Sequence, residues 1–319
     1  MKMSKNNPIL QVLDAAHFNW VQGGVFADLR EAGGEVFNNE AIYIVPPNSI
    51  INFLRWLRCC AKIATQRRVL FSSITPLENY VKFPKLIPRQ TIGLWFTHKD
   101  GEFNESEIRA LRRSQIIFLH STREANKIEK VCSAKKIVML AAIDPSRFTR
   151  SARKEKRIVW VGTATNRKNP ELLLEIVKAL KNEEFLVLGK NWLSSEYANN
   201  LFEYGNVEYR EIEHPLNVDD LDGCDIFITT SRVEGGPMPL LETLAAGLVP
   251  VSTDTGFVRE IYNEAQIPEN LIVPPERDYF VSGILTARKL IENGLEPNRA
   301  AVLALDFSRL ATILDDNLK

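Results

Sequence analysis

The sequence predicts an α/β protein in which two domains are each built on a parallel β-sheet. Its 319 residues, 45% of them hydrophobic, can bury a large core and exceed the usual size of one domain. Short β-rich runs alternate with amphipathic helical patterns along nearly the whole chain, which is typical of βαβ units. A polar and basic stretch at 148–157, FTRSARKEKR, interrupts this alternation near the middle. We therefore expect no packed element there and place the interdomain linker in it, with domains at 1–149 and 150–319.

In the first half, six short apolar runs bounded by polar segments are predicted to be strands, at 9–13, 41–45, 69–72, 91–96, 115–120 and 136–140. Amphipathic helical patterns fit between several of them, notably at 48–64, 104–113 and 121–131. The order of these elements predicts one parallel sheet flanked by helices.

The second half begins again with a strand at 157–162 that ends in a glycine, followed by a polar loop and a helix at 169–181. Further strands are predicted at 185–188, 207–210, 225–230, 249–253 and 271–273. Ligands of open α/β sheets bind at the carboxyl ends of the strands. The loops after Val161, Thr230 and Thr253 are therefore the first place to look for a site.

The composition of the chain indicates where the protein is located and whether its site contains a metal. The apolar runs are far shorter than the roughly 20 residues that a membrane span requires, and the N-terminus lacks a signal-peptide core, so we expect a soluble, cytoplasmic protein. The four cysteines have neither metal-ligand nor disulfide-framework spacing, and adjacent Cys59 and Cys60 are interpreted as packed thiols. No metal-ligand cluster is visible, so we expect a metal-independent site.

The two halves differ in charge although the whole chain is neutral. Residues 1–150 contain 22 Lys and Arg against 13 Asp and Glu, whereas residues 151–319 contain 18 against 27. The basic half includes the segment 48–68, NSIINFLRWLRCCAKIATQRR, in which apolar and cationic side chains interleave. Such a pattern is able to lie on an anionic membrane surface. The alternative is a core-packed amphipathic helix whose charged face is simply exposed to solvent.

The segment 231–247, SRVEGGPMPLLETLAAG, sets two glutamates around a Gly-Gly-Pro turn. Proline at 237 and glycine at 247 predict where a helix begins and ends. Glycines allow a ligand to approach the backbone closely, and free amides at a helix start favour an anion such as phosphate. Glu242 lies about 7–8 Å along the axis from Pro237, so it is placed to accept from ribose hydroxyls while Glu234 meets another polyol. The alternative is that both glutamates merely flank a surface helix.

The sequence EGGPMPLLETLAAGLVPVSTDTGFVREI resembles the donor-site signature, E-x7-E, of the retaining glycosyltransferases of family 4. VGTATNRKNPELLLEIVKAL, NVEYREIE and KKIVMLAAIDPSRF resemble other segments of that family, so the resemblance spans roughly 90–315. It implies the GT-B fold, with two facing Rossmann-like domains. The first would bind the acceptor and the second a nucleotide-diphosphate sugar. A final helix at 298–318 would pack back across the N-terminal domain.

The resemblance also assigns roles to single residues. Glu242 would bind the donor ribose, Glu234 would contact the donor sugar near its reacting carbon, and Lys168 would neutralise the diphosphate. The family usually has an arginine directly after the glycine that matches Gly162, but this chain has Thr163, and Arg167 is the candidate substitute. Solvated charge before a helix is the alternative for both basic residues.

Two further features complete the predicted site. Prolines have no N–H, so the amides that remain to meet the donor are those of Gly235, Gly236, Met238 and Leu240. His98 ends a predicted strand and is similar to a family histidine near the donor sugar and acceptor, with an ordinary structural role as the alternative.

The function implied is transfer of a hexosyl group, with retention, from a UDP- or GDP-sugar to a glycan or lipid-linked saccharide, as in polysaccharide biosynthesis. The basic first half favours an anionic acceptor at the cytoplasmic face of the membrane over nucleic acid. A nucleotide-sugar 2-epimerase of the same fold, or a non-catalytic nucleotide-sugar-binding protein, are the alternatives.

Overall fold

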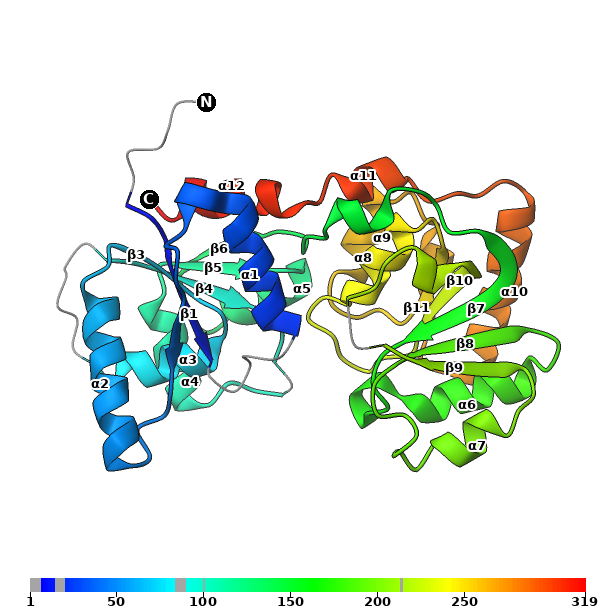
Figure 1. The fold of residues 1–319 in the computed structure, drawn as a ribbon, viewed down its shortest axis with the longest axis horizontal. Coiled ribbons are helices and arrows are strands. Elements are labelled where there is room, and N and C mark those ends of the chain that lie inside the picture. Colours follow the sequence, from blue (N-terminus) through cyan, green and yellow to red (C-terminus); the bar gives the residue numbers. More distant parts are fainter. Residues whose placement is uncertain (1–6, 15–20, 84–89, 100, 213–214) are drawn as a thin grey trace. The chain divides into compact units, whose positions relative to one another are not determined.

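A computed structural model of the chain describes residues 7–14, 21–83, 90–99, 101–212 and 215–319. These form two compact units, one of residues 1–142 with 307–319 and one of residues 143–306 (Figure 1). In the part of the chain that the structure describes, every helix is too short or too polar to cross a lipid bilayer. The division falls between 142 and 143, ahead of the expected boundary at 149/150, and the last residues belong to the first unit.

The first unit contains a fully parallel six-stranded sheet in the order β2-β1-β3-β4-β5-β6. The strands are β1 (Leu10–Asp14), β2 (Ile42–Ile44), β3 (Arg68–Phe71), β4 (Thr91–Phe96), β5 (Ile116–Leu119) and β6 (Lys135–Val138). All six predicted strands are confirmed to within a few residues. Their side chains alternate between two apolar cores, as the two-residue period of a strand requires.

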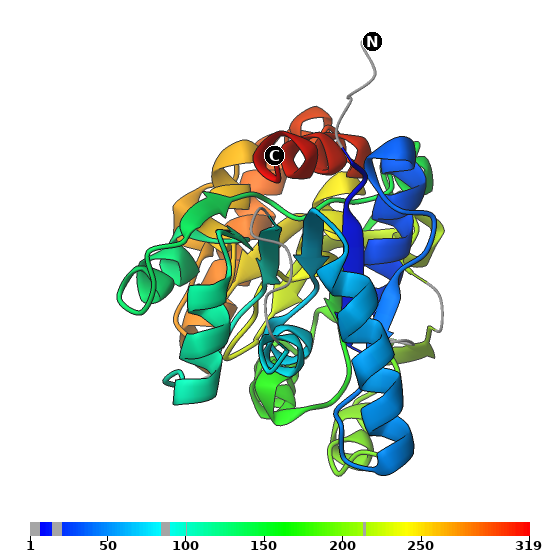
Figure 2. The same ribbon diagram turned by 90° about the vertical axis from the view of Figure 1, so that its left-hand side faces the viewer.

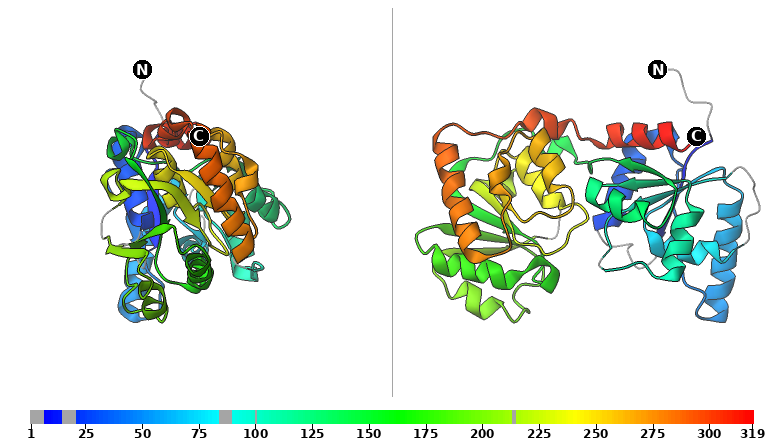
Figure 3. Two further views of the ribbon diagram at one scale, coloured as in Figure 1. Left: turned by 90° about the vertical axis from the view of Figure 1, so that its right-hand side faces the viewer. Right: turned by 180° about the vertical axis from the view of Figure 1, so that it is seen from behind.

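One face of this sheet is covered by α2 (Ile50–Ala64), α3 (Ile74–Val81), α4 (Glu105–Arg113) and α5 (Thr122–Glu129). The other face is covered by α1 (Val21–Gly33) and α12 (Phe307–Asn317), which lie side by side (Figure 3, right). Side chains fix several helix starts. Ser49 accepts the Asn52 amide at 3.2 Å, and Asn104 forms a reciprocal capping box with Glu107.

A buried arginine ties α12 to the sheet. The Arg68 guanidinium donates to the Leu318 carbonyl at 2.7 Å and to the Asp315 carboxylate at 2.6 Å. A Cβ at Gly93 would lie 2.7 Å from a Leu318 methyl group, so the small residue lets the chain end pack flat on the strand. Residues 307–317 of the final segment therefore pack within the first unit.

The prediction of one helix over 298–318 is wrong. The segment forms two helices, α11 (Arg299–Leu303) and α12 of the first unit. In the second unit, α11 packs on α8 (Met238–Ala245) and α9 (Val258–Glu264). The chain is extended between α11 and α12 because Leu305 accepts the Ile143 amide at 2.9 Å and Asp306 forms a parallel bridge with Ile143.

The second unit contains a parallel five-stranded sheet in the order β11-β10-β7-β8-β9. Its strands are β7 (Lys154–Val161), β8 (Glu184–Gly189), β9 (Val207–Glu211), β10 (Gly223–Thr229) and β11 (Val249–Ser252). Its helices are α6 (Pro170–Ala179), α7 (Ala198–Phe202), α8 (Met238–Ala245), α9 (Val258–Glu264), α10 (Arg277–Glu292) and α11. The chain therefore has the predicted α/β architecture of two parallel-sheet domains.

Two further sequence predictions are wrong in this unit. The supposed linker at 148–157 includes the start of β7, because Arg157 pairs in register with Cys224 and Glu184 and forms an ion pair with Glu208 at 2.9 Å. Acidic neighbours thus accommodate a charged strand. The predicted strand at 271–273 is a 3-10 turn (Glu269–Leu271) followed by a single parallel bridge between Ser252 and Ile272.

Candidate functional site

The loops at the carboxyl edge of the second unit's sheet are hydrogen-bonded to one another. Thr230, directly after β10, donates to the Lys168 carbonyl in the loop after β7 at 2.7 Å, and it accepts from Trp160 at 3.1 Å. Thr253, directly after β11, donates to the Ser231 carbonyl at 2.7 Å. The three loops that the sequence singled out therefore form one continuous edge.

Close backbone packing fixes the loop after β7. The Gly162 carbonyl accepts from the Trp192 indole at 2.8 Å, and a Cβ at position 189 would lie only 1.9 Å from that carbonyl oxygen, so glycine is required there. Further on, Asn169 adopts the left-handed conformation (φ 57°, ψ 58°) between a short 3-10 turn and α6. This turn positions the two basic residues that precede it. Thr163, directly after Gly162, is exposed.

Glu234 is the centre of a buried ion cluster. Its Oε1 lies 2.6 Å from Lys168 Nζ and accepts from the Ser231 hydroxyl at 2.8 Å, while its Oε2 lies 2.5 Å from Arg167 Nη1. Only 7% of the Glu234 side chain is exposed. Burial raises the pKa of Glu234, but Lys168 and Arg167 outweigh it, so the pKa lies below its ordinary value. The carboxylate therefore stays ionised and holds the cations in place.

This cluster brings together three residues that the sequence analysis placed at one site. The ion pairs join positions 66 and 67 residues apart, and no local pattern signals them. Ser231, which completes the cluster, was not predicted as a site residue. Its position directly after the predicted strand that ends at Thr230 could have indicated that Ser231 is a site residue.

The Gly-Gly-Pro turn begins α8 as predicted, with Pro237 as the N-cap residue. A Cβ at Gly236 would lie 2.3 Å from the Phe257 ring, so this glycine is needed for packing against the loop after β11, whatever it also allows a ligand. The buried Leu240 donates its amide to the Pro237 carbonyl at 2.9 Å, so this amide is already used. Within the described residues, no recorded hydrogen bond uses the amides of Gly235, Gly236 or Met238. Gly247 ends the helix at φ 88°.

Glu242 lies in the second turn of α8 with 12% of its side chain exposed, and its Oε1 is 3.8 Å from Arg147 Nη1. Burial, assisted by the charge of Asp220, raises the pKa of Glu242 to about 7 although Arg147 opposes the shift. The two glutamates thus have opposite pKa shifts. The pKa of Glu234 lies below its ordinary value, and the pKa of Glu242 lies above it. Arg147 was not predicted as a site residue, although it lies in the quoted segment KKIVMLAAIDPSRF.

His98 lies in the first unit, in the segment after β4, as predicted. Its Nδ1 is buried and has no hydrogen-bond partner among the described residues. His120, after the neighbouring β5, differs because its Nδ1 lies 3.1 Å from the Met139 carbonyl oxygen and burial lowers its pKa to about 4. His98 Nδ1 is thus a buried ring nitrogen without a recorded partner in the described part of the chain, near the carboxyl edge of the first unit's sheet.

The described residues contain no group of His, Cys, Asp and Glu side chains arranged to hold a metal ion. The sequence does include one Asp-x-Asp spacing, Asp220 to Asp222. Asp222 is bound by Arg150 at 2.8 Å and by Arg153 at 3.0 Å, and Asp220 accepts the Asn217 amide at 2.9 Å. Both carboxylates thus have partners from the protein.

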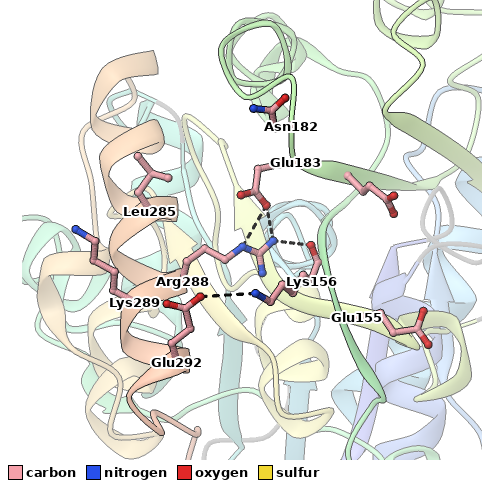
Figure 4. A pocket seen from close by; sticks show the side chains of 9 residues that line it. Glu155, Lys156, Asn182, Glu183, Leu285, Arg288, Lys289 and Glu292 are labelled. Carbon is pink, nitrogen blue, oxygen red and sulfur yellow. Dashed lines mark hydrogen bonds and ion pairs between the residues drawn. The ribbon is translucent and has the colours of Figure 1, made fainter.

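A hollow of about 510 Å³ lies at the opposite, amino-terminal edge of the second unit's sheet (Figure 4). There Arg288 contacts Glu183 at 2.6 Å, the Lys156 carbonyl at 2.6 Å, and the buried Asp225, while Lys156 lies 3.6 Å from Glu292. The charged groups of this hollow are largely paired with one another. They hold α10 against the sheet and leave the carboxyl edge as the candidate site.

Residues 144–300, which make up most of the second unit, match the family described as "Glycosyl transferases group 1". A search of curated proteins found no match. The fold is similar to that of sucrose-phosphate synthase from Thermosynechococcus elongatus (TM-score 0.71, 13% identity, 97% of this chain and 98% of that chain). It is also similar to AviGT4, a glycosyltransferase involved in avilamycin A biosynthesis (TM-score 0.63, 15% identity, 98% and 97%).

A third similar structure is the pneumococcal O-GlcNAc transferase GtfA, solved in complex with UDP and GlcNAc (TM-score 0.54, 13% identity, 83% of this chain and 59% of that chain). At these identities the likeness shows the fold, which is GT-B, with two parallel-sheet α/β domains.

Proposed function

We propose, from the match of residues 144–300 to the glycosyl transferases group 1, that this chain transfers a hexosyl group from a nucleotide-diphosphate sugar with retention of configuration. The observation that carries the proposal is the buried cluster of Glu234 with Lys168 and Arg167 beside the start of α8. Two cations beside backbone amides that no recorded hydrogen bond of the described residues uses support the proposal that a diphosphate and its sugar bind here.

The leaving diphosphate would be stabilised electrostatically. Preorganised cations and amides at a developing negative charge are usually the largest contribution to catalysis. Lys168 and Arg167 supply the charge, and the amides of Gly235, Gly236 and Met238 supply neutral donors at a helix start. These groups do the work that a metal ion does in other phosphate chemistry, so the proposed reaction needs none.

Glu234 would orient the donor sugar by accepting from its hydroxyls. Both of its oxygens are already held by Lys168, Arg167 and Ser231, which makes the carboxylate a poor nucleophile. This favours front-face transfer. The bond between the anomeric carbon and the phosphate oxygen breaks, the acceptor oxygen bonds to the same face of that carbon, and the acceptor proton passes to the leaving diphosphate.

Glu242 would accept from the ribose hydroxyls of the donor. It lies four residues after Met238, about 6 Å along the helix axis, which suits a sugar next to a bound phosphate. A carboxylate that accepts two hydroxyl groups is stabilised in its charged form. Donor binding should therefore lower the pKa of Glu242 from its value of about 7.

The first unit would bind the acceptor, and His98, whose Nδ1 has no hydrogen-bond partner among the described residues, would meet an acceptor or donor hydroxyl. Its excess of basic residues supports an anionic acceptor, such as a growing surface glycan or a lipid-linked saccharide at the cytoplasmic face of the membrane. UDP- and GDP-sugars are the first donors to test, and the UDP bound to one structural neighbour supports starting with UDP.

The test begins with thermal unfolding of the protein in UDP, GDP, ADP and TDP and in their sugars. Ligand at 100 times its dissociation constant should stabilise the protein by about 2.7 kcal/mol. A donor found in this way is then incubated with candidate acceptors, and the configuration of the product is determined by NMR. Stabilisation by none of the nucleotides would contradict the proposal. Epimerised donor would instead assign a 2-epimerase, and tight binding with no turnover a binding protein.

A further inference from the structure

The first two turns of α2 expose a continuous apolar surface on the first unit. Ile50 is 82% exposed and Ile51 is 65% exposed, at positions where a soluble helix would carry polar residues. The described part of the chain has nine exposed large hydrophobic residues, and five of them form this surface, which we call the α2 strip: Ile50, Ile51, Phe53, Leu54 and Leu57. Such clustering marks an interaction site, because apolar residues scattered singly would need no explanation.

The face of α2 next to the strip is packed against the sheet, which leaves the strip itself exposed. Trp56, Cys60, Ile63 and Ala64 are buried against the sheet. The Trp56 indole donates to the Asn79 carbonyl at 2.8 Å and its ring contacts Phe83 edge-on. The alternative interpretation of 48–68, a core-packed amphipathic helix with a solvated charged face, leaves the exposed apolar side chains of the first two turns unexplained. The helix lies at the outside of the first unit (Figure 2).

Cations border the strip. At about 100° per residue, Arg55, Arg58 and Lys62 fall on the side of the strip away from the buried face, and all three are exposed. No Asp or Glu occurs between Glu40 and Glu78 in the sequence. Glu40 lies 3.9 Å from Lys62, and both partners are largely exposed, so this pair contributes little. The helix thus has a buried face, an apolar strip and a cationic edge.

We propose that the α2 strip is a docking surface for an anionic membrane, with α2 lying in the interfacial plane. Apolar side chains would enter the boundary between headgroups and acyl chains while the neighbouring cations meet lipid phosphates, the arrangement of an interfacial helix. Charge argues against a second copy of this chain as the occupant, because two facing strips would bring Arg55 and Arg58 against their like charges. The inference specifies the acceptor side of the proposed function, but its test requires no transfer.

The test measures co-sedimentation of the full chain with phosphatidylcholine vesicles, with and without phosphatidylglycerol, at low and high salt. Binding should require phosphatidylglycerol and weaken with salt. The double variant Arg55→Glu/Arg58→Glu should bind at least about 25-fold more weakly, because each lost contact of a cation with the anionic surface contributes about fivefold. Ile51→Ser/Leu54→Ser should also bind more weakly, but with its salt dependence retained.

Matched controls carry the same changes elsewhere. Arg109→Glu/Lys130→Glu reverses two exposed cations of the same unit, and Leu193→Ser removes an apolar side chain that is 71% exposed in the other unit. Binding that ignores lipid charge, or that falls equally in the charge control, would overturn the proposal. So would a dimer, seen in size-exclusion chromatography, that Ile51→Ser/Leu54→Ser dissolves. UDP affinity should be unchanged in all variants, because donor binding and membrane binding use different residues. A failure of the membrane proposal is thereby distinguished from a failure of the proposed function.

Discussion

Lys168 Nζ lies 2.6 Å from Glu234 Oε1, in a position where the lysine side chain is 13% exposed and the glutamate side chain 7%. An ion pair this buried links stability to function. Removing one partner leaves the other charge desolvated, and the same lysine is proposed to meet the donor diphosphate.

Lys168→Ala should lower both turnover and stability. We expect the free energy of unfolding to fall by about 2–3 kcal/mol, toward the low end for a broken buried pair because Arg167 remains beside Glu234. Transfer should fall at least about 100-fold through the lost charge at the diphosphate. Urea unfolding and steady-state kinetics measure the two effects. Arg232→Ala, which breaks an exposed pair with Glu171, is the control and should cost about 0–1 kcal/mol. Parental transfer rates in Lys168→Ala would remove the residue from the site.

Donor affinity should increase as pH rises from 6 to 8. In the free protein Glu242 has a pKa of about 7, so it is mostly protonated at pH 6 and mostly ionised at pH 8. Ribose hydroxyls bind the ionised form, so UDP should bind with release of a proton and with an affinity gain from this group approaching tenfold over that range. Calorimetry in buffers of different ionisation enthalpy measures the proton. Glu242→Gln retains the ionisation of UDP itself but should lose this contribution, and an identical pH profile in the variant would contradict the assignment.

Gly236→Ala should disturb the turn before α8. The added methyl carbon would lie 2.3 Å from the Phe257 ring, and overpacking of this kind costs about 1–3 kcal/mol. Phe257→Leu should partly restore the stability of the double variant by making room. Gly205→Ala, where nothing lies within 4 Å of the new carbon, is the control and should be near neutral. Thermal unfolding measures the stability of each variant. A Gly236→Ala protein as stable as the parent would mean that the loop after β11 moves freely to accommodate the methyl group.

Arg68→Ala should release α12 from the first unit. The guanidinium is 6% exposed and is bound by the Asp315 carboxylate and by the backbone carbonyls of Leu318 and Asn7. We expect a loss of about 2–4 kcal/mol and faster proteolysis within 307–319. Arg67→Ala changes an exposed neighbour and should stay within about 0.5 kcal/mol of the parent. Equal proteolysis of the two variants would show that Arg68 does not hold the helix.

Transfer should survive EDTA. Lys168 and Arg167 already supply positive charge at the proposed diphosphate site, and the described residues contain no group of side chains suited to hold a metal. The measurement is the initial rate of transfer before and after chelation. Loss of activity that Mn²⁺ or Mg²⁺ restores would show that the protein cations are insufficient.

The sequence was most informative where one local rule decided the structure. Buried strands such as β4 and β5 are largely apolar runs, and the start and end of α8 follow from Pro237 and Gly247. The predictions were wrong where contacts between residues distant in sequence determine the secondary structure. Arg157 lies in a strand because Glu208 on β9 pairs with it, and helix 298–318 is divided because Leu305 pairs with Ile143.

The candidate site shows the same division. Its residues follow from the turn, the glycines and the position of loops at strand ends, and those patterns are local. Its electrostatics are not local. The opposite pKa shifts of Glu234 and Glu242 depend on Lys168 and Arg167 in one case and on burial in the other. Neither cause can be calculated before the loops are in place.

The return of α12 to the first unit has a consequence for synthesis on the ribosome. The face of the sheet that carries Leu70, Trp95 and Phe118 is covered in part by residues 307–319, which are translated after all of the second unit. The second unit is continuous in sequence, so it is able to fold while that face is still open. This apolar face of the first unit therefore stays partly exposed until residues 307–319 have been synthesised. A chaperone that binds apolar surfaces would recognise the nascent chain at this stage.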